Sequence, residues 1–427
     1  MRKEIPFPHS KVSILRETDV LVCGGGPAGV GAAVGSARCG LKTLLIEQYG
    51  VLGGTGTVGL VCIFMHTKGD DRGVFREVVE KLEKMEAIDE NRYFDPEALK
   101  IVLLELLDKE KVDILFHTFI CGTIVENGEV KGVYVANKSG ISAILAKVVI
   151  DATGDGDVCF FAGTPFEKEK KENLQAVTLM FVIGGVDYER LPKDSSFITK
   201  IAQEAKKKGE VNLPFYERPR LGFRGDKVRK GEMNVNIDML IGIDGTDPED
   251  LSLAEKECRK KVWELIKFYK KHIPGMENIY LVETATQVGI RETRRIKGLY
   301  TLTKEDVLNA RKFSDNIAKA SFFIDIHCAE QYLNWEEWIK KYSLPPGEWY
   351  EIPYRCLIPV YPENILVAGR CISADHWAQG SLRVMPTCMA TGQAAGIAAA
   401  LSIKKRCSLR DLDVNEIQRE LRRQNAL

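Results

Sequence analysis

The feature that most constrains this sequence is a glycine-rich turn between an apolar strand and an alanine-rich helix. Residues 18–23 are apolar and β-branched, as in a buried parallel strand, and residues 28–39 predict a helix. The turn between them, Gly24-Gly25-Gly26-Pro27-Ala28-Gly29, fits the pattern G-x-G-x-x-G. Its first glycine permits a tight turn, its second lets a pyrophosphate approach the backbone, and its third lets helix and strand pack closely. The helix N-terminus adds free N–H groups and partial positive charge, so the turn predicts a dinucleotide site.

An acidic residue completes this fingerprint. Residues 42–46 predict a second strand, and Glu47 closes it, ~20 residues after the turn, where a carboxylate accepts hydrogen bonds from an adenosine ribose. We place the adjacent Gln48 at the same site. NAD and FAD share this fingerprint, so it does not by itself decide between them.

A second glycine-rich segment favours FAD. Gly53-Gly54-Thr55-Gly56-Thr57 follows the acid within a few residues, where an NAD dehydrogenase has no need of such a loop. A flavoprotein needs one, because its chain passes beside the pyrophosphate and ribityl groups toward the isoalloxazine ring. The alternative for this segment is a plain flexible loop.

Two more strand ends point to the same crevice. Residues 148–152 and 364–368 are apolar runs that end in Thr153-Gly154 and in Gly369-Arg370. The carboxyl ends of parallel strands converge on the ligand crevice of a doubly wound sheet. A helix of very small residues then begins at Met385, and it either packs its backbone close to a cofactor or is buried among its neighbours.

A chain of 427 residues exceeds the ~250–300 residues of one ordinary core. Asn127-Gly128 predicts a β-hairpin, and the stretch between about residues 164 and 353 differs in texture from both ends. We therefore expect an α/β fold whose nucleotide-binding domain is built from residues 16–163 and 354–427. A β-rich substrate or cap domain, residues 164–353, is inserted between these two parts.

Composition excludes several classes of function. Sixty basic residues cancel sixty acidic ones, which gives no electrostatic footprint for nucleic acid or an anionic membrane. No apolar run approaches the ~20 residues of a membrane helix, and the charged segment 1–16 lacks the continuous apolar stretch of a secretory signal. Eleven scattered cysteines and six histidines show no metal-ligand spacing, so we expect no metal and a cytoplasmic location.

Together these motifs resemble the FAD-dependent oxidoreductases with the glutathione-reductase-like Rossmann fold. More narrowly, they are similar to the family akin to the flavin subunit of heterodisulfide reductase. The matching stretches are residues 24–29 with Glu47, 53–55, 150–157, 288–303, 324–327 and 366–400. The resemblance implies bound FAD, held by Gly24, Gly26, Pro27, Ala28, Gly29, Glu47, Gln48, Gly53, Gly54, Thr55, Ile120, Gly154, Gly369, Arg370 and Met385.

The sequence departs from the family pattern in two places. Many glutathione-reductase-like proteins place an aspartate after the last strand's glycine to hold the ribityl chain, and here that position is Arg370. Either Arg370 contacts a phosphate instead or Asp375 takes over the sugar contact. The clustered cysteines of an iron–sulfur protein are also missing from this sequence, so we expect no such cluster.

The candidate catalytic residues are His376, Arg383, His327 and Arg291. Histidine can act as a general acid or base near neutral pH, and arginine can clamp a substrate carboxylate. The alternative for each histidine is a hydrogen-bonded structural role. Arg291, Arg294 and Arg295 would share one face if their segment is helical, and they either bind an anionic substrate or form internal salt bridges with Glu292. Cys62 is a weaker candidate, a redox thiol without a nearby partner.

These features predict an FAD-dependent oxidoreductase that transfers a hydride between a small-molecule substrate and flavin N5, with an unknown electron acceptor. Three alternatives stay open: an NAD-only dehydrogenase, a flavin-dependent RNA-modifying protein, and an electron-relay subunit of a redox complex. We expect no nucleic-acid or membrane partner. A homo-oligomer or a redox partner remains compatible with the sequence.

Overall fold

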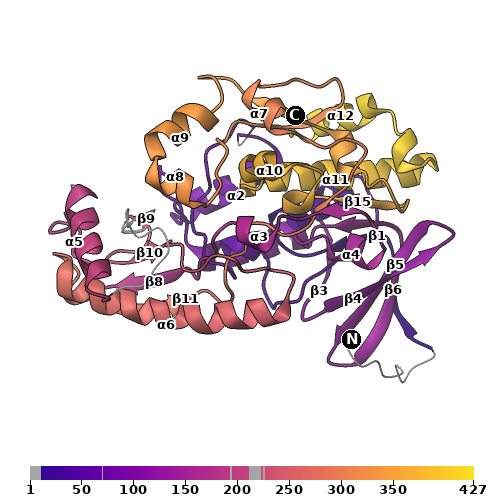
Figure 1. Ribbon diagram of the computed structural model, residues 1–427. Coiled ribbons are helices and arrows are strands. Elements are labelled where there is room, and N and C mark those ends of the chain that lie inside the picture. The colour runs from indigo at the N-terminus through magenta and orange to yellow at the C-terminus, as the bar shows by residue number, and fades with distance from the viewer. Residues whose placement is uncertain (1–10, 70, 193–194, 211–222, 225–226) are drawn as a thin grey trace.

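The structure is a computed structural model that describes residues 11–69, 71–192, 195–210, 223–224 and 227–427 (Figure 1). Most of the N-terminal segment on which we based the prediction of no secretory signal, residues 1–10, lies outside these ranges, as do residues 211–222 of the predicted inserted domain. The strands, in chain order, are β1 (Ser13–Cys23), β2 (Thr43–Ile46), β3 (Asp113–Leu115), β4 (Phe119–Glu126), β5 (Glu129–Asn137), β6 (Gly140–Asp151), β7 (Phe166–Glu167), β8 (Phe181–Gly184), β9 (Phe223–Arg224), β10 (Met233–Val235), β11 (Tyr280–Thr284), β12 (Arg295–Ile296), β13 (Asn316–Ala320), β14 (Tyr350–Pro353) and β15 (Ile365–Val367). The helices are α1 (Pro27–Arg38), α2 (Gly73–Lys84), α3 (Pro96–Lys109), α4 (Asp157–Phe161), α5 (Ser195–Lys207), α6 (Pro248–His272), α7 (Lys304–Leu308), α8 (Ala329–Leu333), α9 (Trp335–Tyr342), α10 (His376–Leu382), α11 (Met385–Lys405) and α12 (Val414–Arg423).

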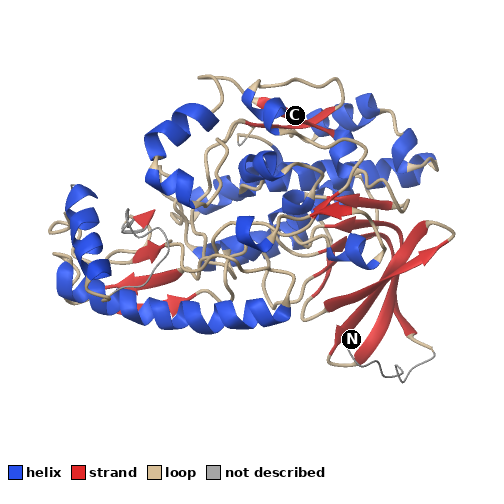
Figure 2. Ribbon diagram, viewed as in Figure 1, coloured by secondary structure: helices blue, strands red, loops and turns tan. Residues whose placement is uncertain are grey.

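A seven-stranded sheet unites the two ends of the chain. Its order is β3-β2-β1-β6-β5-β4, and β15 also pairs with β6. Strands β3, β2, β1, β6 and β15 are parallel, whereas β4 and β5 form an antiparallel extension that projects from the body in Figure 2. The register pairs Cys23 with Ile46 and with Asp151, and Asp151 with Val367. The carboxyl ends of four parallel strands therefore lie side by side, and the predicted α/β fold with a parallel sheet is confirmed.

A second, antiparallel sheet is formed by the middle of the chain, in the order β11-β8-β10-β9. The long helix α6 runs beside it (Figure 1). The carboxylate of Asp247 caps the start of α6 by accepting a hydrogen bond from the Glu249 N–H, at 2.8 Å. The apolar residues Val262, Leu265, Ile266 and Tyr269 of this helix are all buried.

Helices α1 and α11 approach so closely that only glycine fits at their contact. A Cβ atom added at Gly392 would lie 1.9 Å from the Ala28 carbonyl oxygen, and one at Gly396 would lie 2.0 Å from that of Ala32. From the other side, a Cβ at Gly31 would lie 2.2 Å from the Met389 carbonyl oxygen. The small residues of α11 therefore serve close helix packing, which holds the segment before α11 against the glycine turn.

This contact gives a stability prediction. Gly396→Leu places a branched side chain where backbone already stands, so the helices must separate, and overpacking of this kind costs about 1–3 kcal/mol. We expect a lower midpoint of chemical unfolding for this variant. The control is Lys404→Leu on the exposed side of the same helix, which should stay close to the parent protein. An unchanged midpoint for Gly396→Leu would show that the two helices are not in contact.

No single helix in the described part of the chain has the length and apolarity to cross a membrane. The pair α10 and α11 reaches that length and composition only when taken together, and its two members meet at 95°.

Candidate functional site

The glycine turn, Glu47 and the second glycine loop meet at the carboxyl ends of β1 and β2. The backbone N–H of Gly25 donates to Oε2 of Glu47 at 2.7 Å. The carbonyl oxygen of Gly25 accepts a hydrogen bond from the Gly53 N–H at 2.8 Å. Gly54 has a φ of +48°, and a Cβ added there would lie 3.0 Å from the Cα of Gly26. Side chains at these positions would push the two loops apart. The fingerprint and the second glycine loop thus lie against each other at the strand ends, where a doubly wound sheet has its ligand crevice.

Two further predicted positions line the same crevice from the C-terminal half of the chain. Gly369, just after β15, faces the first turn of α1, because a Cβ there would lie 2.7 Å from that of Ala28. Met385, the first residue of α11, approaches the second glycine loop, since its Sδ lies 3.1 Å from where a Cβ at Gly56 would be.

Gly154 and Arg370 lie against each other at the ends of β6 and β15. A Cβ at Gly154 would lie 3.0 Å from an Nη atom of Arg370. That Nη2 atom donates to Oδ1 of Asp155 at 2.7 Å, whereas the Nη1 atom is buried and has no hydrogen-bond partner among the described residues. Arg370 therefore has one unused, buried donor at the crevice.

Asp375, the alternative to Arg370 at the position of the missing aspartate, is held by backbone hydrogen bonds. Both carboxylate oxygens of Asp375 are engaged: one accepts from the Ala378 N–H at 2.7 Å and caps α10, and the other accepts from the Lys304 N–H, also at 2.7 Å. Asp375 is thus a structural helix cap, and Arg370 is the charged group at the strand ends.

The remaining predicted cofactor positions lie at the margins of the crevice. Pro27 and Ala28 begin α1, and a Cβ at Gly29 would lie 1.8 Å from the Gly24 carbonyl oxygen, as expected for close packing of strand and helix. Gln48 and Thr55 are exposed. Ile120 is half-buried in β4, two residues after Thr118, whose N–H donates to the Glu47 carbonyl at 3.0 Å.

These residues fit an extended FAD. No protein atom stands within 4 Å of where a Cβ at Gly26 would be, so there is room beside the helix N-terminus for a diphosphate. The Arg370 donor suits an anion or a polar sugar, and Glu47 stands where the adenosine ribose is expected.

An acidic loop follows β6 at the same edge. Asp151 is fully buried and accepts hydrogen bonds from the Thr153 hydroxyl at 2.7 Å and from the Cys159 N–H at 3.0 Å, which fixes the loop. Nearby, Asp157 pairs with Arg294 at 2.9 Å. Burial and then the charge of Asp155 raise the pKa of Asp157 to about 6 in spite of this arginine.

The raised pKa predicts a pH-dependent stability. In the unfolded chain the pKa of aspartate is ~3.9, so this carboxyl contributes fully to stability only below about pH 4, and the contribution is lost as the pH rises to about 6. As the pH rises from about 4 to about 6, the melting temperature of the parent protein should therefore fall relative to that of Asp157→Asn. The effect is modest because 37% of the side chain is exposed and solvent screens it. A difference in melting temperature that does not change with pH would contradict this.

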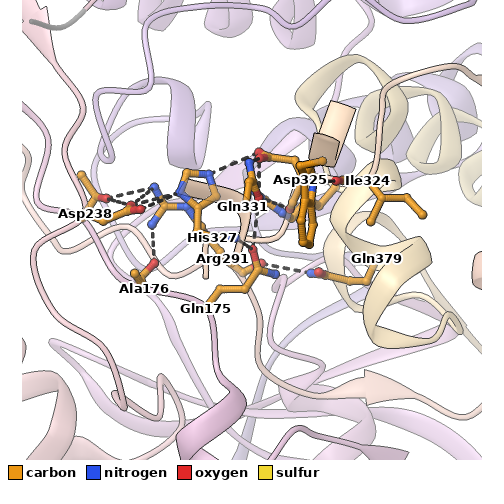
Figure 3. A network of polar contacts seen from close by, with 12 residues as sticks. Gln175, Ala176, Asp238, Arg291, Ile324, Asp325, His327, Gln331 and Gln379 are labelled. Carbon is orange, nitrogen blue, oxygen red and sulfur yellow. Dashed lines mark hydrogen bonds and ion pairs between the residues drawn. The ribbon is translucent and has the colours of Figure 1, made fainter. Parts of the chain in front are cut away.

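All four candidate catalytic residues lie in one connected polar network, and Figure 3 shows the part of it around Arg291 and His327. Arg291 pairs with Asp238 at 2.9 Å, and Asp238 contacts Nδ1 of His327 at 3.0 Å. Nε2 of His327 lies 3.3 Å from Asp325, which also pairs with Arg383 at 3.3 Å. Charges therefore alternate along a chain of five side chains, from Arg291 at one end to Arg383 at the other.

His327 lies between two carboxylates. Its Nδ1 faces a carboxylate oxygen of Asp238 and its Nε2 faces one of Asp325. Burial opposes ionisation of Asp325, but the charge and hydrogen bond of His327, with Arg383, hold the pKa of Asp325 well below its ordinary value. This arrangement suits a structural and electrostatic role for His327, which was the alternative reading of this residue.

His376 has a simpler environment. Its Nδ1 lies 2.8 Å from Oε2 of Glu292, whose side chain is only 1% exposed. The other Glu292 oxygen accepts from the Gln175 N–H at 2.7 Å, and the Gln175 side chain accepts from the His327 N–H at 3.1 Å, which joins His376 to the network. A buried carboxylate that receives Nδ1–H fixes the ring and leaves Nε2 for proton transfer.

The segment Arg291–Arg295 joins this network to the cofactor crevice. Arg291 and Glu292 contact the network, whereas the Thr293 hydroxyl donates to Asp155 at 2.7 Å and Arg294 pairs with Asp157. The condition for a shared face is not met, because the segment is not helical: residues 291–294 have no regular secondary structure and lead into β12, and successive side chains contact different partners. Of the predicted internal salt bridges with Glu292, the structure contains that of Arg295, at 3.7 Å.

The sequence did not single out several members of the network as site residues: Gln175, Asp238, Asp325, Gln331 and Gln379. Asp325 carried a signal, since it stands two residues before His327. Asp238 lies just beyond β10 and approaches His327 only through the fold. The thiol of Cys62 is buried, and burial raises its pKa, so it is a poor nucleophile.

Two glycine loops in contact at the strand ends of a parallel sheet are typical of a dinucleotide-binding protein. A family model described as "FAD dependent oxidoreductase" matches residues 19–421, so the chain belongs to this family and its cofactor is FAD. The predicted resemblance is confirmed.

Similar proteins act on varied molecules. The chain is 31% identical over 151 residues to thiamine thiazole synthase of Methanococcus aeolicus, an alignment of 32% of this chain and 55% of that one. It is 28% identical over 162 residues to digeranylgeranylglycerophospholipid reductase of Thermoplasma acidophilum, covering 32% and 39%. The chain thus spans between 39% and 55% of the length of these curated relatives.

A solved structure shares the fold over most of the chain. It is a geranylgeranyl bacteriochlorophyll reductase-like protein of Thermoplasma acidophilum, with a TM-score of 0.50 and 16% identity, covering 95% of this chain and 83% of the other.

Proposed function

We propose that this protein is a cytoplasmic FAD-dependent oxidoreductase of the glutathione-reductase type, in which residues 164–353 cap the flavin and shape the substrate pocket. The observation that carries the proposal is the segment Arg291–Arg295, which contacts the polar network through Arg291 and Glu292 and the cofactor crevice through Thr293 and Arg294. When bound, FAD supplies a carrier that accepts or donates a hydride at N5. The flavin would exchange the hydride with a small-molecule substrate and pass electrons to an acceptor.

Binding and orientation of the cofactor fall to the residues of the crevice. The diphosphate lies in the space beside Gly26 at the N-terminus of α1, Glu47 accepts hydrogen bonds from the ribose, and the free Nη1 of Arg370 contacts a phosphate or the ribityl chain. The N-terminus of α11 offers partial positive charge near the ring, which favours negative charge there.

Proton transfer falls to His376. Glu292 orients the imidazole through Nδ1 at 2.8 Å, so Nε2 can give a proton to the substrate or take one from it. Arg383 suits a different task. Its Nε is buried without a partner among the described residues, and we assign it the binding of an anionic or carbonyl group of the substrate.

The decisive experiment is purification and reconstitution. The protein should carry a flavin absorption band that is lost on chemical reduction. A colourless preparation that takes up no added FAD would reject the proposal. Screening small molecules for anaerobic bleaching of that band would then identify the substrate.

Arg370→Ala tests the crevice itself. A hydrogen bond to a charged group contributes about 1.5–3 kcal/mol, so we expect FAD affinity to fall roughly ten- to a hundredfold, as measured by titration of the apoprotein. Arg370→Lys should restore part of the affinity. The control Arg419→Ala removes an arginine that is 65% exposed on α12 and should bind FAD normally. Normal FAD binding by Arg370→Ala would show that Arg370 serves the loop around Asp155 only.

A further inference from the structure

An open groove of about 430 Å³ lies next to the polar network, outside the crevice and the network described above. Three segments line it: residues 66–68, which follow the second glycine loop, residues 321–323 and residues 343–348. The apolar lining consists of Phe322, Phe323, Leu344, Pro345 and Pro346. A volume of this size is within the ~300–1,000 Å³ range of small-molecule sites.

The walls of the groove are tied together by hydrogen bonds. The Ser321 N–H donates to the Thr67 hydroxyl at 2.8 Å, and the Lys68 N–H donates to the Ser321 hydroxyl at 2.9 Å. The rings of Phe322 and Phe323 lie 4.6 Å apart, so they form a continuous aromatic surface. Such a groove is largely preformed, which lowers the entropic cost of binding.

Positive charge gathers beside this groove, around Lys68, which lines it, and two further lysines that share a tryptophan with Lys68. The ammonium groups of Lys68, Lys312 and Lys319 lie 5.3, 4.0 and 5.7 Å from the ring centre of Trp349, directly after the lining residue Glu348. Glu348 pairs with Lys312 at 3.3 Å. In the described part of the chain, neither Lys68 nor Lys319 forms an ion pair, so the surface around these lysines keeps an excess of positive charge.

The groove is also connected to the polar network through residues 321–323, which line it, and through α10, which contacts these residues. Its residues 321–323 continue directly into Asp325 and His327. The Ser381 hydroxyl of α10 donates to the Phe322 carbonyl, and α10 begins with His376. A molecule in the groove therefore lies beside the same two elements that position the candidate catalytic side chains.

We propose that this groove binds an organic anion with an apolar body, the anionic group at Lys68 and Lys319 and the body along Phe322 and Phe323. The ligands that fit this description are aliphatic or aromatic carboxylates, sulfonates and phosphates. That this anion is the remote end of the substrate rests on the proposed function, whereas the binding itself does not.

The experiment uses the purified full chain with its flavin and two probes of nearly the same shape. Anilinonaphthalene sulfonate carries an anion, and N-phenylnaphthylamine has the same ring system without it. Equilibrium dialysis should give one sulfonate site. Its Kd should rise about tenfold or more in Lys68→Ala/Lys319→Ala, while binding of the neutral amine stays within about twofold. Phe323→Ala should weaken both probes.

The control is Lys260→Ala/Lys267→Ala, which removes two exposed lysines from α6. Its net charge equals that of Lys68→Ala/Lys319→Ala. Wild-type affinity of Lys68→Ala/Lys319→Ala for the sulfonate would overturn the proposal, and so would an equal loss in the control. Flavin absorbance in the same samples separates the two proposals. A protein that takes up no FAD but binds the sulfonate through these lysines would refute the function and uphold the groove.

Discussion

Replacing His376 with asparagine is expected to lower the rate of substrate turnover by about 10²–10⁴-fold, which is the usual contribution of a positioned general acid or base. The asparagine side-chain amide can still meet Glu292, so the fold and FAD content should change little, but it cannot transfer a proton at neutral pH. The measurement is the anaerobic rate of flavin bleaching by the compound that a screen identifies, for parent and variant, across a range of pH.

A neighbouring variant tests the role of the carboxylate. Glu292→Gln keeps a hydrogen-bond partner for Nδ1 but removes the negative charge beside the ring, so the rate of flavin bleaching should fall, by less than in His376→Asn. The matched control is His272→Asn on α6, where His272 contacts Glu210 at 2.8 Å, a similar pair remote from the network. If His376→Asn and His272→Asn retain equal activity, His376 is a structural residue and the proton has another donor.

The cofactor crevice was predictable because its signals are local. Each glycine of the turn, the strand before it and Glu47 stand within about 30 residues of one another, and a strand–turn–helix unit allows only one arrangement of them. The hairpin at Asn127-Gly128 was predictable for the same reason, because β4 and β5 pair directly across it.

The polar network was only partly predictable, because long-range packing assembles it. The sequence could propose His327, His376, Arg291 and Arg383 from their chemistry, but their partners come from segments far away in the chain. Asp238 is 89 residues from His327, and Glu292 is 84 residues from His376. The spacing of Arg291, Arg294 and Arg295 would place them on one face only in a helix, and this segment is not helical, so each of the three contacts a different carboxylate.

The buried end of the network should dominate its stability. Asp238 and Arg291 have side chains only 3% and 10% exposed, and Asp238 also accepts a hydrogen bond from the Thr178 hydroxyl at 3.2 Å. Asp238→Leu leaves both Arg291 and His327 without this carboxylate in a site that water barely reaches. Breaking one partner of a buried ion pair costs about 3–5 kcal/mol, so the midpoint of chemical unfolding should fall strongly.

A double-mutant cycle separates the pair from its surroundings. Arg291→Met alone should also destabilise, because it leaves Asp238 with less compensation. The double variant Arg291→Met/Asp238→Leu should lose less than the sum of the single losses, since an apolar pair requires no counter-charge. The surface pair of Arg76 and Glu80, 39% and 47% exposed, is the reference, and Glu80→Gln should cost at most about 1 kcal/mol. Strictly additive losses would mean that Arg291 and Asp238 do not interact. The two side chains would then lie close together without stabilising each other. The network would no longer explain how the candidate catalytic residues are held beside the cofactor crevice.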